Sequence, residues 1–211
     1  MSEDWIEKRL AKIDDKSLTR QINTYPAVGG ILQLDGKLVL NFSSNDYLNL
    51  SQHPQVINAS REALEQFGSG STSSRLVSGA LPIHQELEQK LAKHKNYPAA
   101  LLFGTGYMAS MGIIPVLADS SDLIFSDRLV HSCIIDGIKL SGAKNIRFKH
   151  NSVLALSDRL DQYSSNTQKK IIIIESLYSM DGDLAPLQEI ALLAKQHNAI
   201  LMVDEAHATG T

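Results

Sequence analysis

The sequence predicts an α/β fold in which helices cover both faces of a mostly parallel sheet, a three-layer α-β-α arrangement. Two observations support it. Helical and strand-like patterns alternate along most of the chain, and the runs at 170–175 and 199–204 carry consecutive apolar residues rather than alternating ones. Such continuous runs are typical of parallel strands buried on both faces.

Composition restricts the class of protein. The 211 residues are 43% hydrophobic, which suffices for one domain, or one domain with a small appendage. A net charge of -3 gives no electrostatic reason to expect nucleic acid or an acidic membrane as partner. Cys133 is the only cysteine, so no intrachain disulfide forms and a reducing compartment is favoured. No segment approaches the roughly 20 apolar residues of a membrane span, and the first residues lack a signal-peptide core, so we expect a cytoplasmic protein.

Residues 1–50 are expected to form an appendage. Apolar residues from Trp5 to Ile13 fall on one helical face, which predicts an amphipathic helix. The apolar runs 31–34 and 38–42 flank Asp35-Gly36, a strong signal for a β-hairpin.

Residues 51–211 are expected to form the main domain. A helix over 54–67 is opened by Pro54 and ended by Gly68. Further helical patterns with apolar residues three and four positions apart cover 83–94, 107–117, 132–140, 153–163 and 187–197. Between them, short apolar runs predict strands at 99–103, 123–125, 145–148, 170–175 and 199–204.

Glycines follow the first of these strands, in Gly104-Thr105-Gly106-Tyr107, at the start of the next helix. Backbone amides at a helix amino terminus favour an anion, glycine lets the backbone approach it, and the Tyr107 ring can cover a bound ring. The alternative is a turn that serves packing only. The third glycine of the dinucleotide fingerprint is missing, which disfavours a nicotinamide cofactor.

Polar residues also follow other predicted strands. His131 can stack on a planar ring or move a proton near neutral pH, or it simply caps a helix. Ser179 can donate a hydrogen bond to a ligand oxygen, or it belongs only to a tight acidic turn. Arg75, at the end of the small-residue loop 68–74, can bind a carboxylate or phosphate, or it is a surface arginine.

The run 200–203 ends at Asp204, with His207 three residues further on. A carboxylate at the end of a buried strand is costly unless it meets a cation, and a protonated heterocyclic nitrogen meets that need. A metal held by the acid and the histidine, and a magnesium-dependent nucleotide hydrolase, are the alternatives. The first lacks further ligands and the second lacks a glycine-rich loop ending in Gly-Lys-Ser/Thr, so we expect no metal.

Together these segments resemble the α-oxoamine synthases, pyridoxal 5'-phosphate enzymes of the fold-type I, class II aminotransferase superfamily. The resemblance covers almost the whole chain. Its motifs are NFSSNDYL at 41–48, the loop 68–79, FGTGY at 103–107, SDRLVHSCIIDG at 126–137, YSMDGD at 178–183 and VDEAH at 203–207.

The resemblance implies roles for individual residues. Gly106 and Tyr107 would lie beside the phosphate of the cofactor, and Asp204 would contact its ring nitrogen. His131 would stack on the ring and approach the substrate. The remaining two cofactor contacts, to the phenolic oxygen, would come from Ser179 and His207. The catalytic residues implied are therefore His131, Asp204 and His207.

Substrate contacts are implied for His131, for Arg20 near the amino terminus and for Asn45. Members of the family are homodimers with sites at the interface, so Asn45 and the loop 68–74 are expected to serve a neighbour's site.

The segments 42–48 and 74–79 favour the branch of biotin synthesis, which condenses L-alanine with a pimeloyl thioester on coenzyme A or an acyl carrier protein. The alternative is another α-oxoamine synthase, of the glycine C-acetyltransferase type. The family lysine that binds the cofactor covalently follows the 203–207 motif, and no lysine follows it here. We therefore expect an amino-terminal portion, truncated before that lysine and the small carboxyl-terminal domain and inactive alone. The rival interpretation is a catalytically dead, cofactor-binding or dimer-forming protein.

Overall fold

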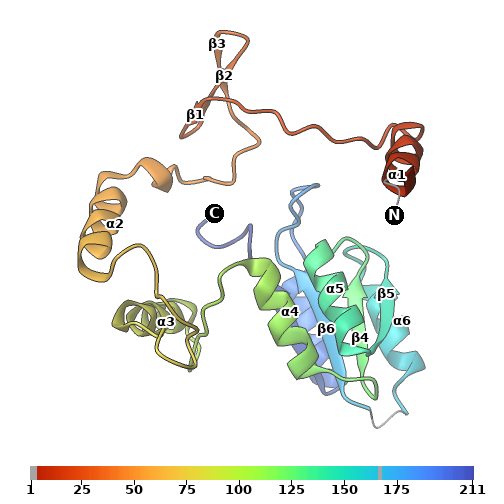
Figure 1. The fold of residues 1–211 in the computed structure, drawn as a ribbon. Coiled ribbons are helices and arrows are strands. Elements are labelled where there is room, and N and C mark those ends of the chain that lie inside the picture. Colours follow the sequence, from red (N-terminus) through yellow and green to blue (C-terminus); the bar gives the residue numbers. More distant parts are fainter. Residues whose placement is uncertain (1–3, 166–167) are drawn as a thin grey trace. The chain divides into compact units, whose positions relative to one another are not determined.

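The computed structural model describes residues 4–165 and 168–211 (Figure 1). It divides into two compact units, Met1–Glu62 and Ala63–Thr211. The sequence-based boundary between an appendage at 1–50 and a main domain at 51–211 stays a prediction.

The first unit contains a helix and a small antiparallel sheet. Helix α1 spans Asp4–Asp14. The sheet has the order β1-β2-β3, with strands at Ala27–Val28, Ile31–Leu34 and Lys37–Leu40. Leu34 pairs with Lys37, and the hairpin turns at Asp35 and Gly36, which have φ values of 49° and 76°. Because both central residues need positive φ, the Asp-Gly pair suits this turn. A short 3-10 helix, η1, follows at Leu50–Gln52, and helix α2 spans Pro54–Phe67.

A four-stranded parallel sheet of order β5-β4-β6-β7 forms the centre of the second unit. Its strands are β4 (Leu123–Asp127), β5 (Lys144–Phe148), β6 (Lys170–Glu175) and β7 (Ala199–Asp204). The helices of this unit are α3 (Pro82–Lys95), α4 (Gly106–Leu117), α5 (Ser132–Ser141), α6 (Val153–Gln162) and α7 (Leu187–Gln196).

Alternate residues of β4 and β6 pack into different cores, one on each face of the sheet. Ile171 and Ile173 belong to the core formed with α4 and α5, which lie side by side in Figure 1. Ile172 and Ile174 belong to the opposite core, which also contains Leu156 of α6 and residues of α7. Every residue of β6 is buried, which is why its sequence is apolar throughout. The predicted three-layer α-β-α fold is confirmed.

One predicted strand is wrong. Residues 99–103 form no strand, although the run is apolar. The amide of Leu102 donates to Glu88 Oε1 at 2.8 Å, and Leu101 is 68% exposed. An apolar run becomes a strand only when a neighbouring strand accepts its hydrogen bonds, and here a side chain takes that place.

Across the described residues, the helices are too short or too polar for any of them to traverse a lipid bilayer.

Candidate functional site

A pocket of about 320 Å³ opens at the carboxyl end of the parallel sheet. Its walls come from the first turn of α4, the start of α5 and the ends of β6 and β7. The polar lining residues are Tyr107, Ser110, His131, Cys133, Glu175, Asp204, Glu205 and His207. Parallel strands bring their carboxyl ends to one rim, so residues far apart in the sequence meet there.

Two carboxylates end the neighbouring strands β6 and β7. Glu175 pairs in register with Asp204, so their side chains leave the sheet at the same level. Asp204 Oδ1 accepts a hydrogen bond from the amide of Ala206 at 2.9 Å, and its carbonyl accepts one from the amide of Ser176 at 2.9 Å. These bonds fix the side chain and the backbone of Asp204 where it lines the pocket.

Glu175 is the buried member of this pair, with 4% of its surface exposed. Burial raises the pKa of the Glu175 carboxyl, and the charge of Asp204 acts in the same direction. The amide of His131 donates to Glu175 Oε1 at 2.6 Å and opposes this rise. Glu175 thereby ties the end of β6 to the start of α5.

His131 is the amino-terminal cap of α5. Its Nδ1 accepts a hydrogen bond from the amide of Cys133 at 3.3 Å and lies 3.0 Å from Cys133 Sγ. The thiol in turn lies 3.4 Å from Ser110 Oγ, in the buried layer between α4 and α5. Because Nδ1 accepts from the backbone, this geometry favours the tautomer whose N–H is on Nε2.

Helix α4 presents its amino terminus to the pocket. Thr105 caps it, since its Oγ1 accepts from the amide of Met108 at 3.1 Å. The Tyr107 hydroxyl donates to Asp136 Oδ2 at 2.5 Å, and this bond raises the pKa of Tyr107. The pKa of Asp136 is lowered by Lys139 and then by Tyr107. The amino terminus of α4 therefore favours the binding of an anion, and the protonated Tyr107 hydroxyl lies beside it.

The pocket brings together five residues that the sequence analysis singled out: Gly106, Tyr107, His131, Asp204 and His207. Four others, Ser179, Arg20, Asn45 and Arg75, are not among its lining residues, and Arg75 Nη1 donates to Glu88 Oε1 at 2.8 Å. Ser179 is exposed in the turn after β6 and does not line the pocket. Arg20 and Asn45 belong to the first unit, where Asn45 Oδ1 is 3.5 Å from the Tyr47 hydroxyl.

Sequence reasoning missed three residues that line the pocket: Glu175, Ser110 and Cys133. The signal for Glu175 was available, because it ends an apolar run as Asp204 does. Ser110 and Cys133 occupy ordinary positions within helical patterns. Only the packing of α4 against α5 brings them to the pocket.

Comparison with known proteins places this geometry in context. The model for the family "Aminotransferase class I and II" matches residues 37–211. A putative 8-amino-7-oxononanoate synthase of Trichodesmium erythraeum is 44% identical over 207 residues, which are 98% of this chain and 53% of that protein. The 8-amino-7-oxononanoate synthase of Trichlorobacter lovleyi is 46% identical over 205 residues, 97% of this chain and 52% of the relative. The chain thus spans about half the length of the curated relatives it matches.

Solved structures agree with these matches. A serine palmitoyltransferase from S. paucimobilis with bound PLP-myriocin aldimine superposes with a TM-score of 0.84 at 35% identity, covering 96% of this chain and 52% of that one. The 8-amino-7-oxononanoate synthase of Francisella tularensis gives a TM-score of 0.60 at 34% identity, covering 78% of this chain and 44% of that one.

Proposed function

This chain belongs to the family of class I and II aminotransferases, and on that premise we propose that it is part of an 8-amino-7-oxononanoate synthase. The proposed reaction condenses L-alanine with a pimeloyl thioester, carried by coenzyme A or an acyl carrier protein, and releases carbon dioxide. Relatives at 42 to 46% identity carry that name, which supports the assignment. The activity proposed is that of a protein of the relatives' full length, of which this chain covers about half.

The pocket fits pyridoxal 5'-phosphate. A phosphate needs clustered N–H donors, which the amino terminus of α4 offers beside Gly106 and Tyr107. A pyridinium nitrogen needs a carboxylate, which Asp204 offers from the pocket floor. When bound, this cofactor supplies an electron sink for charge that develops on the substrate α-carbon.

Asp204 has the central role in this proposal. Its carboxylate would keep the ring nitrogen protonated and so preserve the electron sink. The bond from the Ala206 amide holds the Asp204 side chain in one orientation, which lowers the cost of ordering it on binding. Glu175 lies in register beside Asp204 on the neighbouring strand, and its burial raises its pKa.

His131 would lie against the face of the ring and approach the substrate. The bonds from its amide to Glu175 and from the Cys133 amide to its ring fix the imidazole plane. With Nδ1 accepting, Nε2 carries the N–H, which is free to donate to a substrate carboxylate. Tyr107, locked by Asp136, would bound the phosphate end of the pocket.

The remaining roles rest on the family motifs. Ser179 and His207 would contact the phenolic oxygen of the ring, and Arg20 and Asn45 would contact the substrate. A second copy of the chain would complete each site, as in a homodimer.

The observation that carries the proposal is the meeting of the Glu175–Asp204 pair, His131 and the amino terminus of α4 around one pocket. Titration of the purified chain with pyridoxal phosphate, followed by visible absorption, tests it. We expect saturable binding of one cofactor per chain. Asp204→Ala should weaken binding by about tenfold or more, because a cation in a half-buried site loses its partner. The matched control is Asp158→Ala, an exposed acid of α6, which should leave the affinity unchanged.

Two further measurements divide the alternatives. Borohydride reduction should give no stoichiometric lysine adduct with these 211 residues, and such an adduct would contradict the assignment of the covalent anchor to another part of the protein. With the full-length protein, carbon dioxide release from carboxyl-labelled L-alanine should depend on pimeloyl-CoA. Faster turnover of glycine with acetyl-CoA would instead assign the chain to the glycine C-acetyltransferase type.

A further inference from the structure

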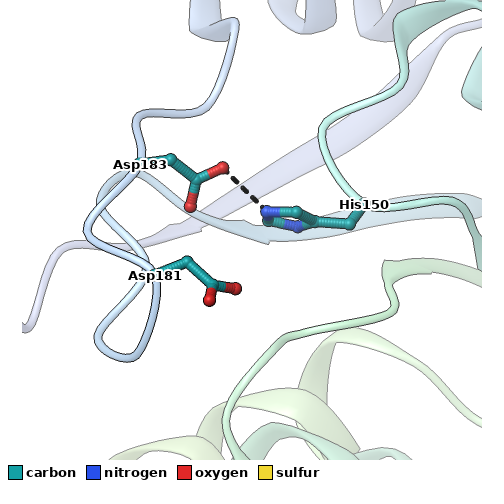
Figure 2. Close-up of side chains that lie close together, drawn as sticks. All are labelled: His150, Asp181 and Asp183. Carbon is teal, nitrogen blue, oxygen red and sulfur yellow. Dashed lines mark hydrogen bonds and ion pairs between the residues drawn. The ribbon is translucent and has the colours of Figure 1, made fainter.

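His150 lies between two aspartates on a part of the rim outside the pocket. Its Nδ1 is 2.9 Å from Asp127 Oδ1, and its Nε2 is 2.8 Å from Asp183 Oδ2. Figure 2 shows the His150 ring directed at Asp183, with Asp181 on the same turn. One polar atom of each of these three residues lies within 4.8 Å of the others. Three separate segments therefore meet at one imidazole ring.

Asp127, the last residue of β4, is 1% exposed and fully engaged. Its Oδ1 accepts from the amide of Leu129 at 2.8 Å as well as facing His150, and its Oδ2 accepts from the amide of Asn151 at 2.9 Å. A carboxylate buried to this degree is tolerated only when charged or N–H groups surround it. Asp127 thus forms the fixed base of the cluster.

The two ring nitrogens of His150 both face carboxylates, so both act as donors when the ring is protonated. Burial lowers the pKa of His150, but the bonds and charges of Asp127 and Asp183 outweigh it, and the pKa of His150 is raised overall. The Tyr178 ring packs edge-on at 4.4 Å, and burial raises the pKa of Tyr178 so that it stays neutral. When protonated, the ring donates to both carboxylates and has no lone pair for a metal ion.

Asp183 belongs to the turn that carries Ser179. Within this turn the amide of Tyr178 donates to the carbonyl of Asp183 at 3.1 Å, and the amide of Gly182 donates to the carbonyl of Tyr178 at 2.8 Å. Asn151 adds a second link, since its Nδ2 donates to Asp183 Oδ2 at 2.5 Å. Ser179 lies inside the loop that these bonds close.

We propose that His150 is a positioning residue, which clamps the Tyr178–Asp183 turn to the end of β4 by bridging Asp127 and Asp183. The clamp is independent of any ligand. Only its consequence for the cofactor, the placement of Ser179, rests on the proposed function. Ser179 and Asp181 of the turn are exposed, and the ion pair attaches its Asp183 end to β4, alongside the Asn151 bond to Asp183 and the buried Tyr178 ring.

The proposal makes the turn pH-sensitive. The charged and titratable groups that face His150 are Asp127 from β4, Asp181 and Asp183 from the turn, and Tyr178 from the end of β6. A histidine whose pKa is raised on folding stabilises the fold fully below its ordinary pKa and loses this contribution as the pH rises through the raised value. The attachment of the turn should therefore be strongest below the ordinary pKa of histidine and weaken as the pH rises through the raised pKa of His150.

Hydrogen exchange of peptides from 177–185 tests this in the wild-type protein, reported as protection factors so that the intrinsic pH dependence is divided out. We expect protection of the Gly182 and Ala185 amides to fall by about tenfold as the pH rises through the His150 pKa. His150→Gln should have low protection at every pH, without the step. Asp183→Asn should move the step to lower pH, because one anion is lost. The matched control is His197→Gln: His197, the carboxyl-terminal cap of α7, lies 3.7 Å from Asp161 of α6 and is no member of the cluster, so its loss should leave the step intact.

A wild-type turn whose protection does not change with pH would overturn the clamp, and so would a step that survives in His150→Gln. Zinc-dependent protection at high pH would assign the cluster to a metal ion and also overturn it. Pyridoxal phosphate affinity, measured on the same samples, separates this proposal from the function. A pH-dependent fall in protection without cofactor binding supports the clamp and contradicts the proposed function. Cofactor binding without such a fall supports the function and contradicts the clamp.

Discussion

Gly137 of α5 lies against α4, and its replacement by alanine tests the packing that shapes the pocket. A Cβ at Gly137 would lie 2.8 Å from the Ser110 carbonyl oxygen and 2.9 Å from Ile114 Cδ1. Ordinary contacts begin at 3.4 Å, so α4 must retreat by 3.4 − 2.8 = 0.6 Å. Ile114 is 1% exposed and packs on the sheet, which leaves little room for that movement.

The expected cost follows from two opposing effects. Overpacking of a core costs about 1–3 kcal/mol, and contact with a backbone oxygen belongs at the upper end. Alanine returns about 1 kcal/mol through its higher helix propensity. We expect a net loss of about 2 kcal/mol, which lowers the urea midpoint by about 1 M for a typical slope.

Urea unfolding followed by circular dichroism measures this loss. The control is Gly70→Ala, where a Cβ meets nothing within 4 Å, and its midpoint should not change. Ile114→Val removes Cδ1 and should partly rescue Gly137→Ala, so the two changes should be less than additive. The pKa of Tyr107 should also fall toward its ordinary value, because separation of the helices lengthens its bond to Asp136. Unchanged stability together with an unchanged Tyr107 titration would refute the reasoning.

Three other outcomes are expected. Leu156→Ala should lower the free energy of unfolding by about 2–5 kcal/mol in urea titrations, because Leu156 is fully buried, whereas Leu154→Ala, at an 80% exposed position of the same helix, should change it little. The wild type should lose stability as the pH rises through the raised pKa of Glu175, and Glu175→Gln should remove this loss. Urea midpoints measured across pH test this. Gly79→Ala should increase proteolysis of the 68–79 loop, because its Cβ would lie 1.9 Å from the Ser73 carbonyl oxygen, with Gly70→Ala as the unaffected comparison.

The elements of the second unit were largely predictable because each has a local signature. Helix α2 and strand β6 begin and end at the predicted residues, since Pro54, Gly68 and a run of four isoleucines mark them. Residues 99–103 show the limit of such patterns. Their apolar composition fits a strand, but strand formation depends on a pairing partner that local sequence does not reveal.

The site was predictable where polar residues follow strands and where glycines open a helix. Asp204, His207 and His131 stand out in this way, and the structure gathers them around one pocket. The His150 cluster was not predicted, although Asp183 lies within a recognised motif. Its geometry depends on the register of β4 against β5, which brings Asp127 opposite Phe148, two residues before His150. No pattern along the chain encodes that proximity.

The His131 ring caps the amino terminus of α5 and also lines the pocket. The way a ligand contacts this ring is therefore coupled to the stability of the first turn of α5. A molecule that lies flat on the imidazole leaves Nδ1 bonded to the Cys133 amide. A molecule that donates to Nδ1 displaces that amide and uncaps the first turn of α5. Hydrogen exchange at the Cys133 amide therefore distinguishes a molecule that stacks on the His131 ring from one that donates a hydrogen bond to Nδ1.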